Sequence, residues 1–435
     1  MNILLVNYHS DRNAGDKVLL TVTLQQLRQR FPQAQITVAT NDPATYQGAD
    51  PCVGSFATWI KQTDVHGDGW RIGGLLTLPV WGLVTILAAL AYRLGLRPKS
   101  RSEHAHPSTK SHWALLRSYT EADLIVSCAG NFLYSSGSVG MPFLLAVLSL
   151  GYGILLDKPV YTMPQTIGPL SRSWERKLLA WVLPHLRLIL VRDRISLDLV
   201  HSLTTGKGNN CQLSPDIAFA FQGIDAEQGR RFLIKMGLPP DNDRPLLGLT
   251  AINWGAQDRT FAGQEAYEKA LAAAADHFIR VQGGRIVLFA QVCGPTASED
   301  DRIPARRIHA LIPHDPGEAI LVDELVPAEM LQAAYANMDL FLGSRLHSNI
   351  FALVAGVPVV AVAYQYKTLG LMEMLGLKAW TLAIEESTQQ TLTDLLERLW
   401  DQRQPVATHI AQRTSEIRQE IDQAINLIAQ DVQSR

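Results

Sequence analysis

The sequence predicts an α/β protein with two Rossmann-like, doubly wound domains facing a cleft, followed by a long C-terminal helix. Three observations support this fold class. Short apolar runs alternate with amphipathic segments along most of the 435 residues. The alternation weakens once, in a polar stretch at 221–244 that contains Pro239 and Pro240, and then resumes. The 47% hydrophobic content is enough for two cores of ordinary size.

The first domain is expected at residues 1–222. Its apolar runs and helical patterns follow one another in the order that is typical of a parallel sheet covered by helices. The expected strands cover 3–6, 36–39, 123–127, 159–163 and 186–191, and the expected helices cover 17–30, 141–152 and a segment ending near Leu199. The polar stretch at 221–244 is the predicted junction with the second domain.

The second domain is expected at 245–400. Its expected strands cover 246–250, 285–290, 319–322, 340–342 and 357–363, with helices between them. After Pro405, isoleucines recur at spacings of three, four or seven residues, which predicts a helix at 404–433 with one apolar stripe. Such a stripe needs a partner surface, and we expect it to pack against the two domains. This layout indicates a GT-B-like architecture.

One insertion, at about 70–117, interrupts the first domain. Its segment 75–92 carries no charge, and the basic residues Arg93, Arg97, Lys99 and Arg101 follow it. A membrane-spanning helix here would place two parts of one α/β domain on opposite sides of a bilayer, which argues against spanning. Two interpretations stay open for 75–96: peripheral contact with a membrane surface, and a buried helical insertion.

Charge and composition exclude some classes of function. A net charge of −2 and a pI near 6.6 give no basic surface for nucleic acid. The N-terminus lacks the basic and long apolar regions of a secretion signal, so we expect a cytoplasmic protein, with the inner face of the membrane as an alternative place. No Asp-x-Asp or clustered histidines occur in the segments that we expect to form the site, and no metal or cofactor is predicted.

The most informative stretch is 340–367. It predicts a strand, a helix that starts at Ser344-Arg-Leu-His and ends at Gly356, a second strand, and then Lys367. The carboxyl ends of adjacent parallel strands form one crevice, where a helix N-terminus offers unpaired N–H groups to an anion. Arg345, His347 and Lys367 are expected to line this crevice. The predicted ligand is a small, multiply charged anion.

Six segments, in chain order, resemble the polysaccharide pyruvyl transferase family. The resemblance covers most of the chain, and its last segment, with Arg-Leu-His, Gly-Val-Pro and Tyr-x-Tyr-Lys, is the most specific. The segments are Asn-Ala-Gly-Asp at 13–16, Gly-Asn-Phe-Leu at 130–133, Gln-Thr-Ile-Gly-Pro at 165–169, Val-Arg-Asp-Arg-Ile-Ser at 191–196, Ser-Pro-Asp-Ile-Ala-Phe at 214–219, and 344–367. Where family members often have three glycines, this chain has Cys128-Ala-Gly130.

The resemblance implies transfer of a pyruvyl group from phosphoenolpyruvate to two hydroxyls of a sugar in a polysaccharide or its precursor. The product is a cyclic ketal, and phosphate is released. The partners are therefore phosphoenolpyruvate, bound by the second domain, and a saccharide acceptor, bound by the first. A lipid-linked acceptor is the natural one if 75–96 lies on a membrane.

The candidate residues fall into three groups according to the role that we assign. His347 and Asp16 are the catalytic candidates, with His347 as acid and base. Donor contacts are assigned to Arg192, Ser344, Arg345, Leu346 and Lys367, and acceptor contacts are assigned to Asn13, Gly15, Gly130, Asn131 and Gln165.

Each candidate also has a purely structural interpretation. His347 can bond only to backbone, and Lys367 can be a solvated loop residue. Arg345 can form an interdomain salt bridge, and Arg192 can pair with Asp193 or Asp216. Asp16 can cap the first helix.

Two other functions remain open. One is a GT-B glycosyltransferase that uses a nucleotide sugar, but the helix after Ser344 has no carboxylate for ribose hydroxyls at 349–352. The other is a non-catalytic protein that binds glycans or assists polysaccharide assembly. The complete set of Arg345, His347 and Lys367 argues against this second alternative.

Overall fold

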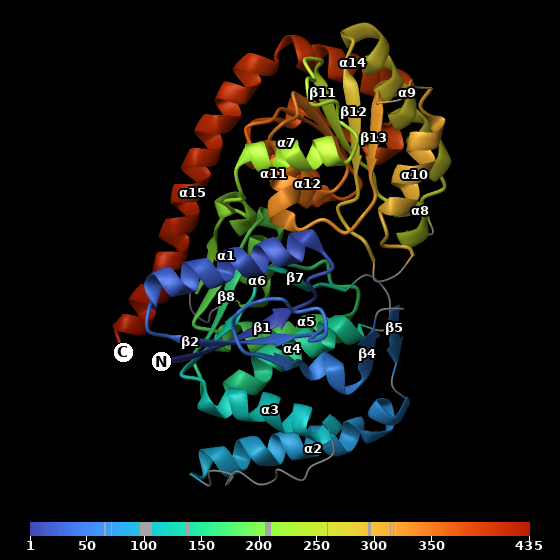
Figure 1. Cartoon of the computed structure of the whole chain (residues 1–435). Coiled ribbons are helices and arrows are strands. Elements are labelled where there is room, and N and C mark those ends of the chain that lie inside the picture. Colours follow the sequence, from blue (N-terminus) through green and yellow to red (C-terminus); the bar gives the residue numbers. More distant parts are fainter. Residues whose placement is uncertain are drawn as a thin grey trace. The chain divides into compact units, whose positions relative to one another are not determined.

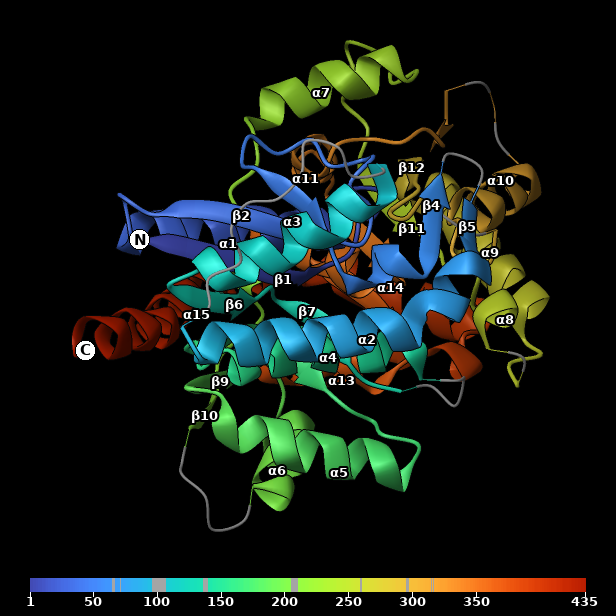
Figure 2. The same ribbon diagram turned by 90° about the horizontal axis from the view of Figure 1, so that it is seen from below.

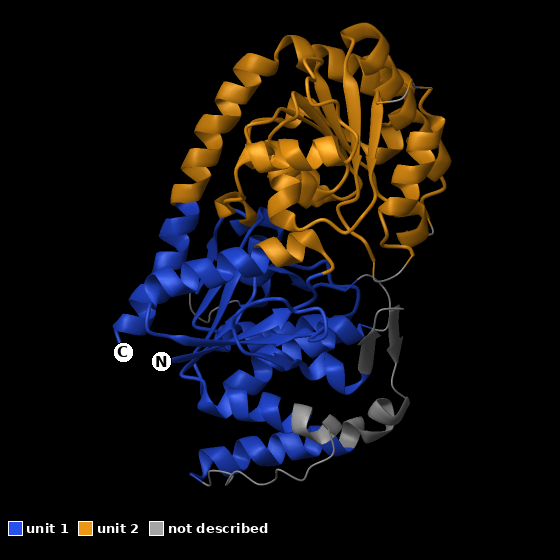
Figure 3. Ribbon diagram, viewed as in Figure 1, with its two compact units in different colours: residues 1–11, 19–217, 420–435 blue, residues 12–18, 218–419 orange. Residues whose placement is uncertain are grey.

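The computed structural model describes residues 1–64, 67–70, 72–95, 107–135, 140–204, 210–258, 260–294, 297–313, 315 and 317–435, with side chains outside 61–79 and 107–111. By its internal contacts the chain divides into two compact units (Figure 3). Unit 1 comprises Met1–Asp11, Leu19–Ile217 and Glu420–Arg435, and unit 2 comprises Arg12–Val18 and Ala218–Gln419.

Unit 1 is built on a parallel sheet in the order β10-β9-β8-β6-β1-β2-β3, with β7 beside β8 (Figure 1). The strands are β1 (Asn2–Tyr8), β2 (Gln35–Thr40), β3 (Cys52–Gly54), β6 (Leu124–Ser127), β7 (Gly130–Leu133), β8 (Val160–Ile167), β9 (Leu188–Val191) and β10 (Cys211–Leu213), and a separate hairpin has β4 (Lys61–Asp64) and β5 (Gly67–Trp70). The strand order reverses between β1 and β6, as in a doubly wound fold.

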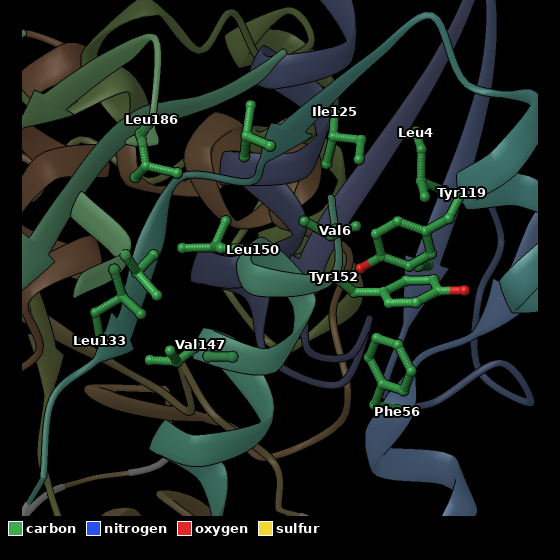
Figure 4. Close-up of a cluster of buried hydrophobic side chains, with 14 of the residues drawn as sticks. Leu4, Val6, Phe56, Tyr119, Ile125, Leu133, Val147, Leu150, Tyr152 and Leu186 are labelled. Atoms are coloured by element: carbon green, nitrogen blue, oxygen red, sulfur yellow. The ribbon is translucent and has the colours of Figure 1, made fainter. Parts of the chain in front are cut away.

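The helices of unit 1 follow the expected alternation with strands. They are α1 (Ala14–Arg30), α2 (Ile72–Arg93), α3 (Pro107–Glu121), α4 (Met141–Leu155), α5 (Ser173–Val182) and α6 (Arg194–Leu203), of which the first turn of α1 belongs to unit 2. Figure 4 shows part of the core, where Phe56, Tyr119 and Tyr152 pack near the aliphatic residues of β1 and α4. This burial of aromatic and aliphatic side chains stabilises the sheet.

Unit 2 has a six-stranded parallel sheet in the order β13-β12-β11-β14-β15-β16. Its strands are β11 (Leu246–Thr250), β12 (Arg285–Phe289), β13 (Ala319–Val322), β14 (Leu340–Gly343), β15 (Val359–Ala363) and β16 (Thr381–Ala383). Its helices are α7 (Ala226–Lys235), α8 (Trp254–Gln257), α9 (Gln264–Gln282), α10 (Arg302–Leu311), α11 (Ala328–Tyr335), α12 (Leu346–Val354), α13 (Tyr366–Met374), α14 (Gln389–Asp401) and the start of α15 (Arg403–Gln433). The order reverses between β11 and β14, which gives this sheet its own switch point.

The predicted fold class is confirmed: two doubly wound parallel sheets are present, with a long C-terminal helix. Each half of α15 packs on its own unit. In unit 2, Arg418 Nε donates to the carbonyl of Phe219 at 3.0 Å, and in unit 1, Arg30 Nη2 lies 2.6 Å from Asp422 Oδ1. The predicted apolar stripe is buried from Ile410 to Ile428, as its spacing required.

One helix was not predicted, and one strand was predicted too short. The polar stretch at 221–244 contains α7, whose N-terminus is capped by the carboxylate of Asp225. Only a narrow side of α7 is buried, so its apolar pattern was too weak to read. Strand β8 also continues through Pro164 to Ile167 instead of ending at Met163. The register with β9 is irregular between Thr162 and Gln165, so Pro164 lies where a missing N–H donor is tolerated.

The insertion contains α2 and α3. Trp81 of α2 stacks on His112 of α3, with ring centroids 4.3 Å apart, and His112 also contacts Trp59. The side of α2 away from these contacts is exposed, so the interpretation as a fully buried helix was wrong. Within the residues described, no helix combines the length and the apolar content that crossing a bilayer demands.

Candidate functional site

The start of α12 lies at the switch point of the unit 2 sheet. The sequence predicted a helix start at the carboxyl end of a strand but not the strand order. Strand β14 ends at Gly343, and the Ser344 N–H donates to the carbonyl of Thr250 on the neighbouring strand β11. Arg345 is the N-cap, with extended backbone, and α12 begins at Leu346. Because β11 and β14 are the strands between which the order reverses, this edge is where a doubly wound domain binds its ligand.

In this region the side chain of His347 lies against Gly15. Both belong to unit 2. A Cβ atom added to Gly15 would lie 2.2 Å from His347 Nδ1 and 2.7 Å from Cγ, so the imidazole packs directly on the glycine. Gly15 is in the first turn of α1, and His347 is in the first turn of α12. Two helix N-termini therefore meet at this imidazole, and both favour a nearby negative charge.

Asn13 caps α1, a role that the sequence analysis had offered to Asp16. The Asn13 Oδ1 atom accepts hydrogen bonds from the N–H groups of Gly15 at 2.9 Å and Asp16 at 3.4 Å. The backbone of Asn13 also forms a bridge with Val292, which follows β12. Asp16 thus lies inside the first turn of α1. Its carboxylate interacts favourably with the positive end of the helix dipole but does not cap the helix.

A testable consequence of the contact at Gly15 is that even a methyl group there displaces His347. We expect Gly15→Ala to lower kcat about 100-fold, because a shift of about 1 Å in a reacting group has an effect of this size. Gly370→Ala is the matched control, since Gly370 lies in α13 and a Cβ there meets nothing within 4 Å. The control should keep full activity and gain about 0.5–1 kcal/mol of stability. Steady-state kinetics and urea unfolding of both variants check this; equal activity of the two variants would contradict it.

The guanidinium of Arg345 is held by a carboxylate that the sequence analysis did not identify. Arg345 Nε lies 3.0 Å from Asp301 Oδ2, and Nη2 lies 2.6 Å from Oδ1. Asp301 is fully buried, and its Oδ2 also accepts from the Val292 N–H at 3.0 Å. Both residues of the ion pair belong to unit 2. The structural interpretation of Arg345 as part of a salt bridge between the domains was therefore wrong. A donor anion at Arg345 has to share the guanidinium with Asp301.

Burial raises the pKa of Asp301 from 3.8 to about 6, although Arg345 and the Val292 N–H lower it. Its pKa in the folded state is thus above its unfolded value, so the stability that protonation gives is present below about pH 4 and is lost as the pH rises through about 6. Relative to Asp301→Asn, the wild type should therefore lose unfolding free energy between these pH values. Urea unfolding of both proteins from pH 4 to 7 measures this difference, and parallel pH profiles would contradict it.

The other donor candidates of unit 2 lie around the same sheet edge. The hydroxyl of Ser344 is buried against the hydroxyl of Tyr267, so its side chain has a structural partner. Leu346 is half-buried and opens α12, where its backbone N–H belongs to the first turn. Lys367 is in the first turn of α13, directly after β15, rather than in a loop. Tyr364, on the segment between β15 and α13, is near enough to the Arg345 guanidinium to affect its pKa electrostatically.

Unit 1 has a buried polar cluster at its own switch point. Ser127, at the end of β6, accepts at its Oγ from Asn7 Nδ2 and Gln165 Nε2, both at 3.0 Å. Asn7, the last residue but one of β1, has a left-handed φ of 60°, which asparagine tolerates better than most residues. Gly130, opposite Gln165 in the sheet, has a φ of 150°, and a Cβ there would collide with Phe132. The structure thus brings together the predicted Gly130 and Gln165. Asn131, which follows Gly130 in the chain, is half-buried.

Arg192 forms the structural pair that the sequence analysis offered as an alternative. Its Nη1 contacts Asp216 Oδ2 in an ion pair in which both side chains are more than nine-tenths buried, and its Nε donates to Thr166 Oγ1 at 2.9 Å. Asp193, the other partner considered, instead caps α6 by accepting from the Ser196 N–H at 2.7 Å. Arg192 and Asp216 belong to unit 1.

Four residues near these candidates were missed: Asn7, Ser127, Asp301 and Tyr364. Asn7, Ser127 and Tyr364 each stand at or just after the end of an apolar strand, a signal that could have been used. Asp301 has no such signal, because it precedes α10 and reaches Arg345 only through the fold. Among the side chains that are described, no three or more His, Cys, Asp or Glu residues are grouped to hold a metal ion.

Comparison with known proteins matches residues 13–366 to the family model described as polysaccharide pyruvyl transferase. The amylovoran biosynthesis protein AmsJ of Erwinia amylovora is 23% identical over 390 residues, which is 87% of this chain and 86% of AmsJ. Among solved structures, UDP-GlcNAc 2-epimerase from Neisseria meningitidis bound to UDP-GlcNAc has a TM-score of 0.59 at 10% identity over the full length of both chains. Anabaena Alr3699/HepE in complex with UDP-glucose has a TM-score of 0.55 at 13% identity, again over both full lengths. These two likenesses show the fold, which is GT-B-like.

Proposed function

Because this chain belongs to the polysaccharide pyruvyl transferase family, we propose that it transfers the pyruvyl group of phosphoenolpyruvate to two hydroxyls of a sugar. It is a transferase of polysaccharide biosynthesis, as the family and the likeness to AmsJ indicate. The donor, the ketal product and the release of phosphate are the proposed part. The acceptor is a saccharide of an exopolysaccharide or its precursor.

The contact of His347 with Gly15 is the observation that carries the proposal. It places an imidazole where the first turns of α1 and α12 meet, beside Arg345, the N-cap of α12. Phosphoenolpyruvate has a carboxylate and a phosphate on a three-carbon frame. Two helix N-termini and a guanidinium suit this charge, with the ammonium of Lys367 one strand away in the sheet.

Proton transfer is the main catalytic requirement of the proposed reaction. A proton adds to the CH2 carbon of the donor, which becomes the methyl group, and the neighbouring carbon becomes electrophilic. One sugar hydroxyl attacks that carbon, the bond to the phosphate oxygen breaks, and the second hydroxyl closes the ketal ring. Of the two hydroxyl protons lost, one balances the new methyl group and the other leaves with phosphate. A single imidazole can deliver the proton that forms the methyl group and can take up a proton from a hydroxyl.

We assign the acid and base role to His347, with Asp16 assisting deprotonation from the first turn of α1. Arg345 and Lys367 contact the donor anions, with the α12 backbone at Ser344 and Leu346. Arg192 is proposed to bind the leaving phosphate. The phosphate then shares the Arg192 guanidinium with Asp216. Saccharide hydroxyls are assigned to Asn13, Gly15, Gly130, Asn131 and Gln165.

Phosphoenolpyruvate labelled with 13C at its second carbon provides the test. Incubation with the enzyme and a set of saccharide acceptors should convert the enol carbon signal into a ketal carbon signal, with one phosphate released for each ketal. Heat-inactivated enzyme is the control for spontaneous donor hydrolysis. Phosphate release with labelled free pyruvate, and no ketal with any acceptor, would contradict pyruvyl transfer.

A further inference from the structure

Helix α2 presents an apolar row to solvent. Val80, Leu83, Ile86, Leu87 and Leu90, with Leu94 just after the helix, are 51–77% exposed. They recur three and four residues apart, so they share one side of the helix. The opposite side carries Trp81, Thr85 and Ala89, which are buried or half-buried. The buried side of α2 makes the contacts of this helix with the rest of unit 1. The exposed row therefore has no role in the core of unit 1.

Helices α4 and α5 add a second apolar area. On α4, Leu144, Leu148 and Leu155 share one side and are exposed. Trp181 of α5 lies over that same side, because its ring is 3.8 Å from the position of a Cβ on Gly151. Trp174, seven residues before Trp181 and thus on the same side of α5, is also exposed. Two tryptophans therefore border the leucines of α4.

The two areas meet where α2 and α4 end. Arg93 Nη2 donates to the carbonyl of Ile154 at 3.4 Å, and Lys158 Nζ lies 5.0 Å from the ring centroid of Tyr92. The three helices can be followed in Figure 2, which views the molecule from below. We call the exposed row of α2, the exposed leucines of α4, and Trp174 and Trp181 together the apolar face. Exposed apolar residues on three neighbouring helices mark an interaction site.

The charges that neighbour α2 and α5 in the sequence indicate what the apolar face binds. From Gly69 to Ser102 the sequence has no acidic residue, whereas Arg71, Arg93, Arg97, Lys99 and Arg101 are basic. On α5, Lys177 lies between Trp174 and Trp181 on the same exposed side. Leucines flanked by tryptophans and cations are the pattern of helices that lie in the interface of an anionic bilayer. Asp157, exposed two residues after Leu155, is an acidic residue at this face, beside the cations Arg93, Lys158 and Lys177.

We propose that the apolar face docks unit 1 flat on the surface of an anionic lipid bilayer. The leucines of α2 and α4 enter the headgroup boundary, Trp174 and Trp181 lie at its level, and Lys177 and Arg93 contact the lipid phosphates. The docking involves α4 and α5 as well as the insertion, so removing α2 alone weakens it without abolishing it. It does not depend on phosphoenolpyruvate or on pyruvyl transfer.

Flotation of the full chain with lipid vesicles tests the proposal. Vesicles of phosphatidylcholine with one third phosphatidylglycerol are compared with vesicles of phosphatidylcholine alone. We expect binding to the anionic vesicles that weakens as salt is raised. Leu87→Glu with Leu90→Glu should lower the partition coefficient at least about tenfold, because two inserted leucines become charges. Lys177→Glu should lower it about tenfold on anionic vesicles only.

The matched control is Val281→Glu with Leu311→Glu, which changes two exposed apolar residues of unit 2. This control should float like the wild type, and thermal unfolding should show that all variants are folded. No flotation of the wild type, or equal loss in the control pair, overturns the proposal. Self-association by light scattering that the α2 pair abolishes, without vesicle binding, assigns the face to a second copy of the chain and also overturns it.

Discussion

Replacing His347 by glutamine is expected to lower kcat at least about 1,000-fold, because the proposed reaction protonates the CH2 carbon and takes up a hydroxyl proton at this one group. Glutamine keeps the size and polarity of the side chain but neither gives up nor takes a proton near neutral pH. Donor binding should persist, since the helix N-termini, Arg345 and Lys367 remain. Rapid-quench turnover and calorimetric titration with phosphoenolpyruvate on the same protein separate these two effects.

His309→Gln is the matched control for this experiment. His309 is also in unit 2, on the last turn of α10, and its Nε2 bonds to the carbonyl of Ala319 at 3.3 Å. It should retain wild-type turnover. If His347→Gln turns over within tenfold of the wild type, the imidazole serves only the packing on Gly15, and another group has to carry the protons.

The second large effect is on stability. Arg345→Ala is expected to cost about 3 kcal/mol of unfolding free energy at pH 7.5, because it leaves the fully buried carboxylate of Asp301 without its cation. Arg345→Ala with Asp301→Asn should recover most of this loss, since both charges are then gone. Urea unfolding of the wild type, both single variants and the double variant forms a complete cycle.

The same variants also show whether a loss of phosphoenolpyruvate binding comes from the missing guanidinium or from a local change in structure. Loss of phosphoenolpyruvate binding in Arg345→Ala alone can reflect local collapse around Asp301, whereas loss in the stable double variant reflects the missing guanidinium. Additive losses in the cycle would contradict the coupling that the short Arg345–Asp301 contacts indicate.

Much of the fold could be predicted because its strands are short, fully apolar and separated by helices. Strand β11 lies at its predicted bounds, and β14 and β15 lie within two residues of theirs. Helix α7 escaped prediction because its sequence is polar and its stability depends on contacts with α11, which only the tertiary structure supplies. Strand β8 escaped because Pro164 usually ends a strand, and only the irregular register with β9 makes room for it.

The candidate site was predictable to a smaller extent. Polar residues at strand ends could be assigned to a crevice, and α12 begins where its residues indicated. The packing of Gly15 on His347 could not be foreseen, because these residues are far apart in the chain and meet only through unit 2. Asp301 was hidden for the same reason. An acidic residue before a helix is ordinary, and nothing in its spacing pointed to Arg345.

The most direct test of the proposed function is calorimetric titration of the wild type with phosphoenolpyruvate, beside Lys367→Ala and a panel of nucleotide sugars. We expect saturable binding of phosphoenolpyruvate that weakens at least about tenfold in Lys367→Ala, because one charge-assisted contact is lost, and no heat from the nucleotide sugars. Binding of a nucleotide sugar by a protein that ignores phosphoenolpyruvate would contradict it and would indicate a glycosyltransferase on the same fold.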